Sequence, residues 1–231
     1  MKTLLTIPIV LWSFFSYAQF NENTSGRYAG QFEITLYDAP VEGSPYLDEM
    51  YKTGKATIAG ASQASMLMRY NAYADEMEFL DSTGKPRKLM KNTNVVVDLD
   101  GTIYEVHEYE HRGKMKEGYF IALNEGPIIL YKKPGKQFRQ AEQLQNSYEE
   151  VTPAKYSDNT TYYLWEDGKD MQQIRLNRKD FIYHLDDNTR SLKKFLQRQK
   201  LKLKTEEEAV KVLTYYNKMQ QLKGTNENAQ A

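Results

Sequence analysis

The 231-residue sequence predicts an α+β fold: an antiparallel β-meander (a curved sheet or a sandwich-like arrangement) followed by a small C-terminal helical segment. Short runs of β-branched and aromatic residues alternate with turn residues over most of the chain, which is typical of hairpins. The hydrophobic period then changes from two to about 3.6 near Asn177. Strands therefore come first and helices last, which is the order of an α+β domain.

Three pairs of strand-like runs predict the hairpins of the meander. Residues 95–99 and 102–106 flank Asp100-Gly101. Two β-branched runs around Asp-Gly are the strongest short-range hairpin signal, because both turn residues must tolerate positive φ. A second pair is expected at 118–123 and 128–131, a third at 162–164 and 171–176, and a further strand over residues 28–37.

The densest run of aromatic, sulfur-containing and charged side chains covers residues 66–81 and permits two interpretations. Its apolar residues form one stripe of a helix, but they also alternate as on strands. We expect two paired strands, 66–73 and 76–80, that close near Ala74-Asp75, with a helix as the alternative. The side chains expected to face inward are Met68, Tyr70, Met77 and Phe79.

The antiparallel β domain is expected to span residues 19–176, with a mobile loop near 132–159. That segment is rich in Lys, Gln and Glu and has few hydrophobic anchors. Residues 177–223 are expected to form helices, and Thr205 with Glu208 makes a capping box at the start of the last one. Residues 224–231 are expected to be a disordered tail.

Residues 1–18 have the three parts of a secretory signal peptide. Lys2 is followed by an apolar run from Leu4 to Phe15, and Ser16-Tyr17-Ala18 supplies small residues at positions −3 and −1 before Gln19. A membrane anchor is the alternative, but it needs roughly 20 apolar residues. We therefore expect an exported, soluble protein, periplasmic or secreted, with no transmembrane segment in the mature chain.

The composition excludes several classes of site. The chain has no cysteine, which excludes disulfides, cysteine-based zinc sites and thiol nucleophiles. Its 31 basic and 31 acidic side chains balance, so nothing indicates nucleic acid as a partner. The 18 tyrosines make the chain tyrosine-rich. Half-buried positions on a sheet are the expected explanation, and an adaptable contact surface is the alternative.

The sequence His107-Glu108-x-x-His111 matches the zinc-protease signature. On a helix the two histidines would stand about 6 Å apart and could share one metal, whereas on a strand they would be about 13 Å apart. The neighbouring β-formers and the Asp100-Gly101 hairpin favour a strand. We therefore reject His107, Glu108 and His111 as metal ligands and expect no cofactor, with a zinc hydrolase kept as an alternative function.

Four acids in the dense run, Asp75, Glu76, Glu78 and Asp81, suggest a calcium site or a carboxylate pair for glycoside hydrolysis. A calcium loop needs a glycine for its sharp turn, and none is there. A solvated hairpin edge is the favoured interpretation, with Arg69 in a cross-strand ion pair.

A run without acids carries seven basic residues: Arg190, Lys193, Lys194, Arg198, Lys200, Lys202 and Lys204. Attraction to anionic envelope glycans or lipid head groups is one interpretation. A solvated helix face, complemented by Glu206-Glu207-Glu208, is the one that we favour.

The chain resembles a family of uncharacterised exported proteins from Bacteroidota. The resemblance rests on Arg69-Tyr70-Asn71-x-Tyr73-x-Asp75-Glu76-Met77-Glu78, on Gly118-Tyr119-Phe120 with Leu130-Tyr131-Lys132-Lys133, and on a Lys-rich helical C-terminus. It covers most of the mature chain. In similar sequences the Arg-Tyr-Asn segment is more β-branched, which implies the strand pair; the resemblance implies no activity.

The sequence thus favours a non-catalytic binding or structural role in the cell envelope, with a peptide, a glycan or a protein as partner. The expected contact surface is the tyrosine-rich sheet with the 132–159 loop. A carrier of an apolar ligand between the sheet and the helices is a further alternative. The residues predicted to form the binding surface are Arg69, Tyr70, Asn71, Tyr73, Asp75 and Glu76.

Overall fold

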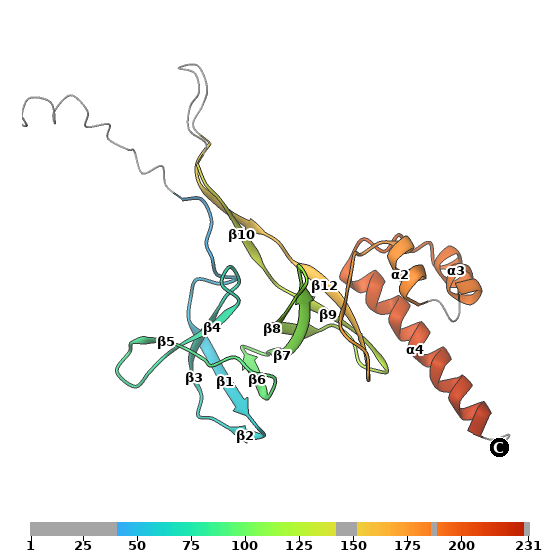
Figure 1. The fold of residues 1–231 in the computed structure, drawn as a ribbon, viewed down its shortest axis with the longest axis horizontal. Helices are drawn as coiled ribbons and strands as arrows, with labels where there is room; N and C mark the ends of the chain where they lie inside the picture. The colour runs from blue at the N-terminus through green and yellow to red at the C-terminus, as the bar shows by residue number, and fades with distance from the viewer. Residues whose placement is uncertain (1–40, 142–151, 186–188, 229–231) are drawn as a thin grey trace, which may run out of the picture. The chain divides into compact units, whose positions relative to one another are not determined.

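An antiparallel, curled sheet forms the centre of the fold, and three helices follow it (Figure 1). The computed structural model describes residues 41–141, 152–185 and 189–228. Within these residues the strand order is β13-β12-β9-β8-β7-β6-β1-β3-β4-β5, and β2 pairs with β1. A second sheet contains β10 and β11. The predicted α+β class is therefore confirmed.

The strands and helices of the described residues have the following bounds, in chain order. The strands of the first half are β1 (Lys52–Ile58), β2 (Ala61–Ser62), β3 (Met66–Asn71), β4 (Glu76–Leu80), β5 (Pro86–Lys88), β6 (Val95–Leu99) and β7 (Thr102–His111). The later strands are β8 (Lys114–Ala122), β9 (Ile128–Lys133), β10 (Lys136–Arg139), β11 (Lys155–Asp158), β12 (Thr161–Glu166) and β13 (Gln172–Ile174). The helices are α2 (Arg178–His184), α3 (Thr189–Arg198) and α4 (Glu206–Asn228).

The predicted hairpins at 95–106, 118–131 and 162–176 are present as β6–β7, β8–β9 and β12–β13. Asp100 and Gly101 have φ of 53° and 83°, the positive values that a two-residue hairpin turn requires. A further hairpin joins β7 to β8 through Arg112-Gly113, where φ is again positive. That hairpin was not predicted, and β8 begins four residues earlier than the expected strand at 118–123.

The ambiguous run at 66–80 is a strand pair, as predicted. β3 and β4 pair with Met68 opposite Phe79 and Tyr70 opposite Met77. Met68, Tyr70 and Met77 are buried, and Phe79 is partly buried against the same core. The helical alternative is therefore wrong.

The curl of the sheet brings together strands that are not neighbours in it. β3 and β8 are separated by three strands, yet the rings of Tyr70 and Tyr119 have centroids 5.9 Å apart. These two rings belong to a core built from β1, β3, β4, β6, β7 and β8. The next residue, Phe120, belongs to another core on the opposite face, together with Tyr109, Tyr131, Tyr163 and Met171.

The helices pack against β9, β12 and β13 through a third core. Leu130 and Leu164 of the strands belong to one cluster with Phe181 of α2, buried leucines of α3 and the apolar residues of α4. The spacing of Ala209, Val212, Leu213, Tyr216 and Met219 makes one stripe of a helix, and in α4 the first four are buried while Met219 is partly buried. The amide of Glu208 donates to Thr205 Oγ1, as expected at a helix start, whereas the Glu208 carboxylate accepts from the Lys204 amide. In the described part of the chain, no helix has the length and apolarity needed to cross a bilayer.

Two boundary predictions differ from the structure. Both ends of the expected loop near 132–159 form strands, β10 and β11, because Phe138 and Tyr156 pair and their rings pack together. The expected tail at 224–231 begins inside α4, which continues to Asn228. The signal peptide at 1–18, the expected strand at 28–37 and residues 142–151 lie outside the described residues.

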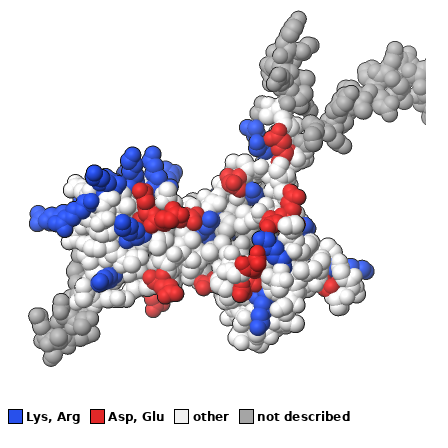
Figure 2. Space-filling model, turned by 180° about the vertical axis from the view of Figure 1, so that it is seen from behind, with Lys and Arg blue, Asp and Glu red and all other residues white. Residues whose placement is uncertain are grey.

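Charged side chains are distributed unevenly. Figure 2 shows acids and bases intermixed over the strands on the face that it presents, whereas basic side chains gather along one side of the helical part.

β8 and β9 separate along part of their length, and this split positions the candidate site. The two strands pair only at Ile121–Lys132 and Ala122–Tyr131. Towards the N-terminal half of β8 they separate, and the β3–β4 turn fills the gap. The Lys136 amide donates to the Ala72 carbonyl, and the Tyr119 amide donates to the Asp75 carboxylate. The Tyr119 amide of β8, in the part of the strand that is not paired with β9, thereby has a partner.

Candidate functional site

A pocket of about 350 Å³ opens over this split. It is formed by the β3–β4 turn, the ends of β7 and β9, the start of β8, and β12. We call it the Lys133 pocket; its lining includes Tyr73, Asp75, Lys91, Tyr109, His111, Lys116, Glu117, Lys133, Thr161 and Tyr163. Its volume is at the lower end of the range for small-molecule sites, about 300–1,000 Å³.

Asp75 is the hub of the pocket floor. It has a φ of 56°, a left-handed conformation that non-glycine residues adopt mainly in turns. Its Oδ1 accepts from the Tyr70 hydroxyl at 2.7 Å and from the Tyr119 amide at 3.2 Å. Its Oδ2 accepts from Lys133 Nζ at 2.7 Å and from Lys91 Nζ at 3.0 Å. A carboxylate has about four acceptor sites, so Asp75 is saturated and has no lone pair left for a general base.

Lys133 is the most enclosed cation of the pocket, with its side chain 11 % exposed. Its ammonium lies 5.0 Å from the ring centroids of both Tyr109 and Phe120, within cation–π range. Burial lowers the pKa of Lys133, and the neighbouring Asp75 carboxylate acts in the opposite direction. The ammonium makes one ion pair, with Asp75, and an ammonium has three donors.

Gly118 makes room for this ammonium. A Cβ at position 118 would lie 2.5 Å from Lys133 Nζ, 2.8 Å from a ring carbon of Tyr109 and 3.1 Å from Asp75 Oδ2. Carbon atoms essentially never approach so closely, so any side chain here would displace the lysine. The glycine in β8 is therefore required by packing, as is common where two groups approach a strand closely.

The remaining basic groups of the pocket are more exposed. Lys91 donates to the Asp75 carbonyl as well as to its carboxylate, at 2.7 and 3.0 Å. Lys116 is exposed on β8. His111 is half-buried, and its pKa is lowered by burial and then by the charges of Lys116, Arg112 and Lys133. The pocket thus holds three lysines against two carboxylates, Asp75 and Glu117.

Aromatic rings supply the walls. Tyr109 and Tyr163 are buried, and their rings meet edge to face at 5.6 Å. Burial raises the pKa of Tyr109 to about 12, so its hydroxyl stays a neutral donor. Tyr73 is 52 % exposed at the rim and meets Tyr156 of β11 at 5.4 Å.

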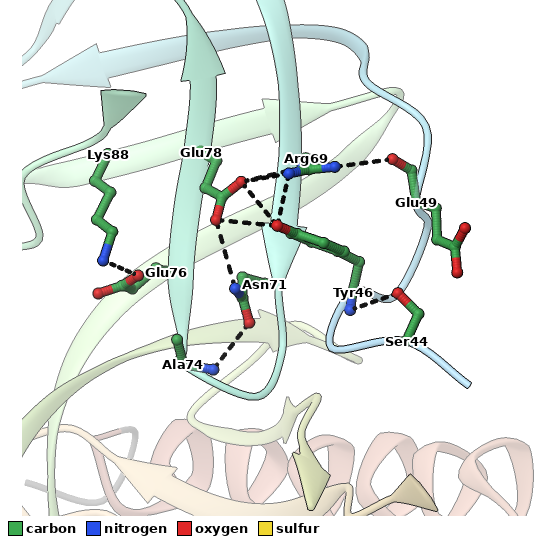
Figure 3. Close-up of polar contacts among 9 residues, drawn as sticks. All are labelled: Ser44, Tyr46, Glu49, Arg69, Asn71, Ala74, Glu76, Glu78 and Lys88. Carbon is green, nitrogen blue, oxygen red and sulfur yellow. Dashed lines mark hydrogen bonds and ion pairs between the residues drawn. The ribbon is translucent and has the colours of Figure 1, made fainter. Parts of the chain in front are cut away.

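A second polar cluster lies on the same β3–β4 hairpin, and we call it the Arg69 cluster: Tyr46, Arg69, Asn71 and Glu78 (Figure 3). The predicted cross-strand ion pair is present, with Arg69 Nη2 2.9 Å from Glu78 Oε2. The guanidinium is covered by the rings of Tyr46 at 3.6 Å and Tyr51 at 4.4 Å. The cluster is therefore closed by the segment that precedes β1.

The expected solvated edge of acids is wrong for two of its four residues. Glu78 is 9 % exposed inside the Arg69 cluster, and Asp75 is bound to two lysines in the Lys133 pocket. Glu76 does pair with the exposed Lys88, and Asp81 holds a turn and pairs with Arg87. The sequence could not show that the chain folds over both faces of this hairpin.

The structure divides the six residues of the predicted binding surface. Tyr73 and Asp75 line the Lys133 pocket. Arg69 and Asn71 belong to the Arg69 cluster, and the Asn71 side chain also accepts from the Ala74 amide. Tyr70 is 1 % exposed and points its hydroxyl at Asp75, while Glu76 lies outside both sites.

Most residues of the Lys133 pocket were not predicted from the sequence. The structure adds Lys91, Tyr109, Lys116, Lys133 and Tyr163, which come from four separate parts of the chain. Lys133 follows Asp75 by 58 residues, a separation at which no local pattern predicts contact. The only available signal was Lys132-Lys133-Pro134-Gly135, two lysines at the end of a strand-like run.

The zinc-protease sequence lies on β7, which is extended throughout. Neither the common helix face nor the short separation that the motif requires is present. His107 contacts Glu105 Oε2 at 2.9 Å, and His111 lines the Lys133 pocket. Among the described residues, no group of three or more His, Asp or Glu side chains is arranged to hold a metal ion.

No protein-family model, curated protein or solved structure matches this chain. The resemblance to the exported Bacteroidota family therefore stays a prediction.

Proposed function

We propose that the chain is an exported, non-catalytic binding protein whose Lys133 pocket takes a short acidic glycan. The observation that carries this proposal is the convergence of Lys133, Lys91 and Lys116 on a pocket with aromatic walls. Export itself rests on the sequence of residues 1–18.

The electrostatics favour an anionic ligand. Two of the lysines share Asp75, so this group of three charges carries one net positive charge. Lys116 adds a further cation, offset in part by Glu117. The lowered pKa of Lys133 reflects the free-energy cost of burying its charge. A carboxylate or phosphate next to that ammonium would offset this cost.

The walls favour a sugar over an apolar ligand. A sugar ring presents C–H groups that pack on aromatic rings and hydroxyls that need hydrogen-bond partners. The rings of Tyr73, Tyr109 and Tyr163 provide the aromatic surfaces. The Thr161 hydroxyl and the lysine ammonium groups provide the hydrogen-bond partners.

Saturation of Asp75 favours binding over catalysis. Hydrolysis of a glycosidic bond needs two carboxyl groups, one that protonates the leaving oxygen and one that activates water or attacks the sugar. Asp75 is fully hydrogen-bonded to the fold, and Glu117 is the other carboxylate of the lining. The third core packs the helices against the sheet. A hollow of about 340 Å³ remains beside α2, but its lining includes Glu166, Lys169 and Asp170, which do not suit an apolar ligand.

The test is a binding screen of the purified protein against uronic-acid oligosaccharides, sugar phosphates and their neutral counterparts. Lys116→Ala is the test variant, because this exposed lysine can be removed without disturbing the core. Lys114→Ala is the matched control, since Lys114 is exposed on the same strand and does not line the pocket. We expect acidic glycans to bind at least 10-fold more tightly than neutral ones, with a loss of about 5- to 10-fold for Lys116→Ala alone. Equal binding of neutral and acidic glycans, or no binding of either, would refute the proposal.

A further inference from the structure

The helical part carries a separate basic surface, made of Arg190, Lys193, Lys194, Arg198, Lys200, Lys202 and Lys204. All seven residues are exposed. The first four lie on α3, and the last three follow in an irregular segment, residues 200–204, that alternates lysines with buried leucines. Leu192 and Leu196 of α3, with Leu201 and Leu203 of the segment, are anchored in the core. The cations are therefore displayed on a rigid support.

Many lysines of the strands and their connections have a counterion, whereas these seven cations have none among the described residues. Lys52, Lys88, Lys91, Lys132, Lys133, Lys136 and Lys155 all form ion pairs. In the described chain no side chain of the basic surface makes an ion pair or a hydrogen bond. Glu208 lies close enough to Lys202 for the lysine to contribute to lowering the Glu208 pKa, but its carboxylate accepts from the backbone amides of Lys202 and Lys204. The predicted complementation by Glu206 is wrong: it pairs with Lys132 of β9.

The backbone of the irregular segment is held in a specific shape. Lys200 and Leu203 have φ of 53° and 57°, which are unfavourable for residues with side chains. Arg178 of α2 binds this segment, donating to the carbonyls of Leu201 and Leu196. Arg178, Lys200, Lys202 and Lys204, with Gln197, surround an open hollow of about 520 Å³. Four cations thus border one space that is wide enough for several phosphate groups.

We propose that this basic surface binds the phosphate groups of an anionic lipid bilayer. The charges are spread over α3 and the neighbouring irregular segment, so they suit a plane of head groups better than a single small anion. The apolar side of α3 is already used in the core, so the attachment is electrostatic and reversible, without insertion. Clusters of four to eight basic residues on a helix are typical of such binding. The inference uses no residue of the Lys133 pocket and is independent of the glycan proposal.

The experiment is co-sedimentation of the full chain with phosphatidylcholine vesicles, with and without phosphatidylglycerol. The test variant is Lys193→Gln/Lys194→Gln/Arg198→Gln, and the matched control is Lys55→Gln/Lys85→Gln/Lys114→Gln. Both remove three exposed positive charges, but the control removes them from the strands and a strand turn. Binding through the apolar residues 4–15 would be equally strong for both lipid compositions and for both variants. It therefore cannot produce the expected difference between them.

We expect the wild type and the control to bind only when phosphatidylglycerol is present. Each basic side chain near an anionic surface strengthens binding about fivefold, so the test variant should lose on the order of 100-fold. Added salt should remove the binding of the wild type, because the contacts are screened. Equal losses in the two variants, or binding that ignores lipid charge, would overturn the proposal. So would binding to a soluble polyphosphate without binding to anionic vesicles.

Discussion

The β3–β4 hairpin carries two ionic clusters of similar composition but different accessibility. The Arg69 cluster pairs one cation with one carboxylate, and the rings of Tyr46 and Tyr51 cover it. In the Lys133 pocket, Asp75 binds two cations, and the cluster opens onto a volume of about 350 Å³.

Net charge and access to open space distinguish a structural ion pair from a ligand site. In the Arg69 cluster the two charges balance and aromatic rings cover them, so the cluster offers a ligand neither excess charge nor open space. The Lys133 pocket has one cation in excess, and that excess faces a space large enough for a ligand. We therefore expect mutations in the first cluster to change stability alone, and mutations in the second to change stability, binding or both.

The largest expected effect is that of Asp75→Asn. The substitution removes the common counterion of Lys91 and Lys133, so two partly buried cations would repel each other. We expect the free energy of unfolding to fall by about 3 kcal/mol, as for breaking a buried ion pair. Urea denaturation measures it, with Asp158→Asn as the control. Asp158 pairs with Lys136 but is 76 % exposed, so its loss should cost no more than about 1 kcal/mol. Equal effects of the two variants would contradict the account.

Glu78→Gln should cost about 2 kcal/mol of stability and leave glycan binding unchanged. The carboxylate is 12 % exposed and is the counterion of Arg69, whose ring contacts would remain. The control is Glu76→Gln, because Lys88 of the Glu76–Lys88 pair is exposed and the loss of this pair should change stability little. If Glu78→Gln weakened glycan binding without lowering stability, the ligand would bind at the Arg69 cluster and not in the Lys133 pocket.

Gly118→Ala should destabilise by about 1 to 2 kcal/mol, because its methyl group overlaps Lys133 Nζ and the Tyr109 ring. A double-mutant cycle with Lys133→Ala tests the cause. If the ammonium is the obstacle, the cost of Gly118→Ala should fall by about half once the lysine is removed. An unchanged cost would mean that Tyr109 or the backbone of β8 is the limiting contact.

The smallest effect concerns pH. The pKa of His111 is below its unfolded value of 6.5, so between these two values the unfolded chain binds more protons than the folded one. The ligand-free protein should therefore lose some stability as the pH falls below 6.5. The charges of Lys116, Arg112 and Lys133 lower the His111 pKa, and a bound anion would raise it. Acidic glycans should therefore bind up to about 10-fold more tightly at pH 5 than at pH 7. His111→Asn should remove that dependence, and a pH-independent affinity in the wild type would contradict it.

The sequence predicted the hairpins because their signals are local. Asp100-Gly101 dictates its own turn, and alternation at Met68, Tyr70 and Met77 identifies the buried face of β3 and β4. The Arg69–Glu78 pair could be predicted for the same reason, since the residues face each other across one turn. Patterns confined to about ten residues thus carried most of the fold.

The pocket could not be predicted because it is built from long-range contacts. Asp75 meets Lys133, Lys91 and the Tyr119 amide only because the sheet curls and β8 separates from β9. Nothing local to these residues encodes the curl. The same reason explains why Glu78 was expected at a solvated edge: the segment around Tyr46 that buries it lies 32 residues away.

The most direct test of the central claim is an NMR titration of the ¹⁵N-labelled protein with the acidic oligosaccharide that binds most tightly in the screen. We predict that the amide shifts gather at residues of the Lys133 pocket, above all Tyr109, His111, Lys116 and Lys133, and that they saturate with one affinity. The amides of Tyr46, Arg69 and Glu78 should stay unchanged. Shifts centred on the Arg69 cluster, or shifts of equal size with the neutral counterpart of the same sugar, would contradict the claim.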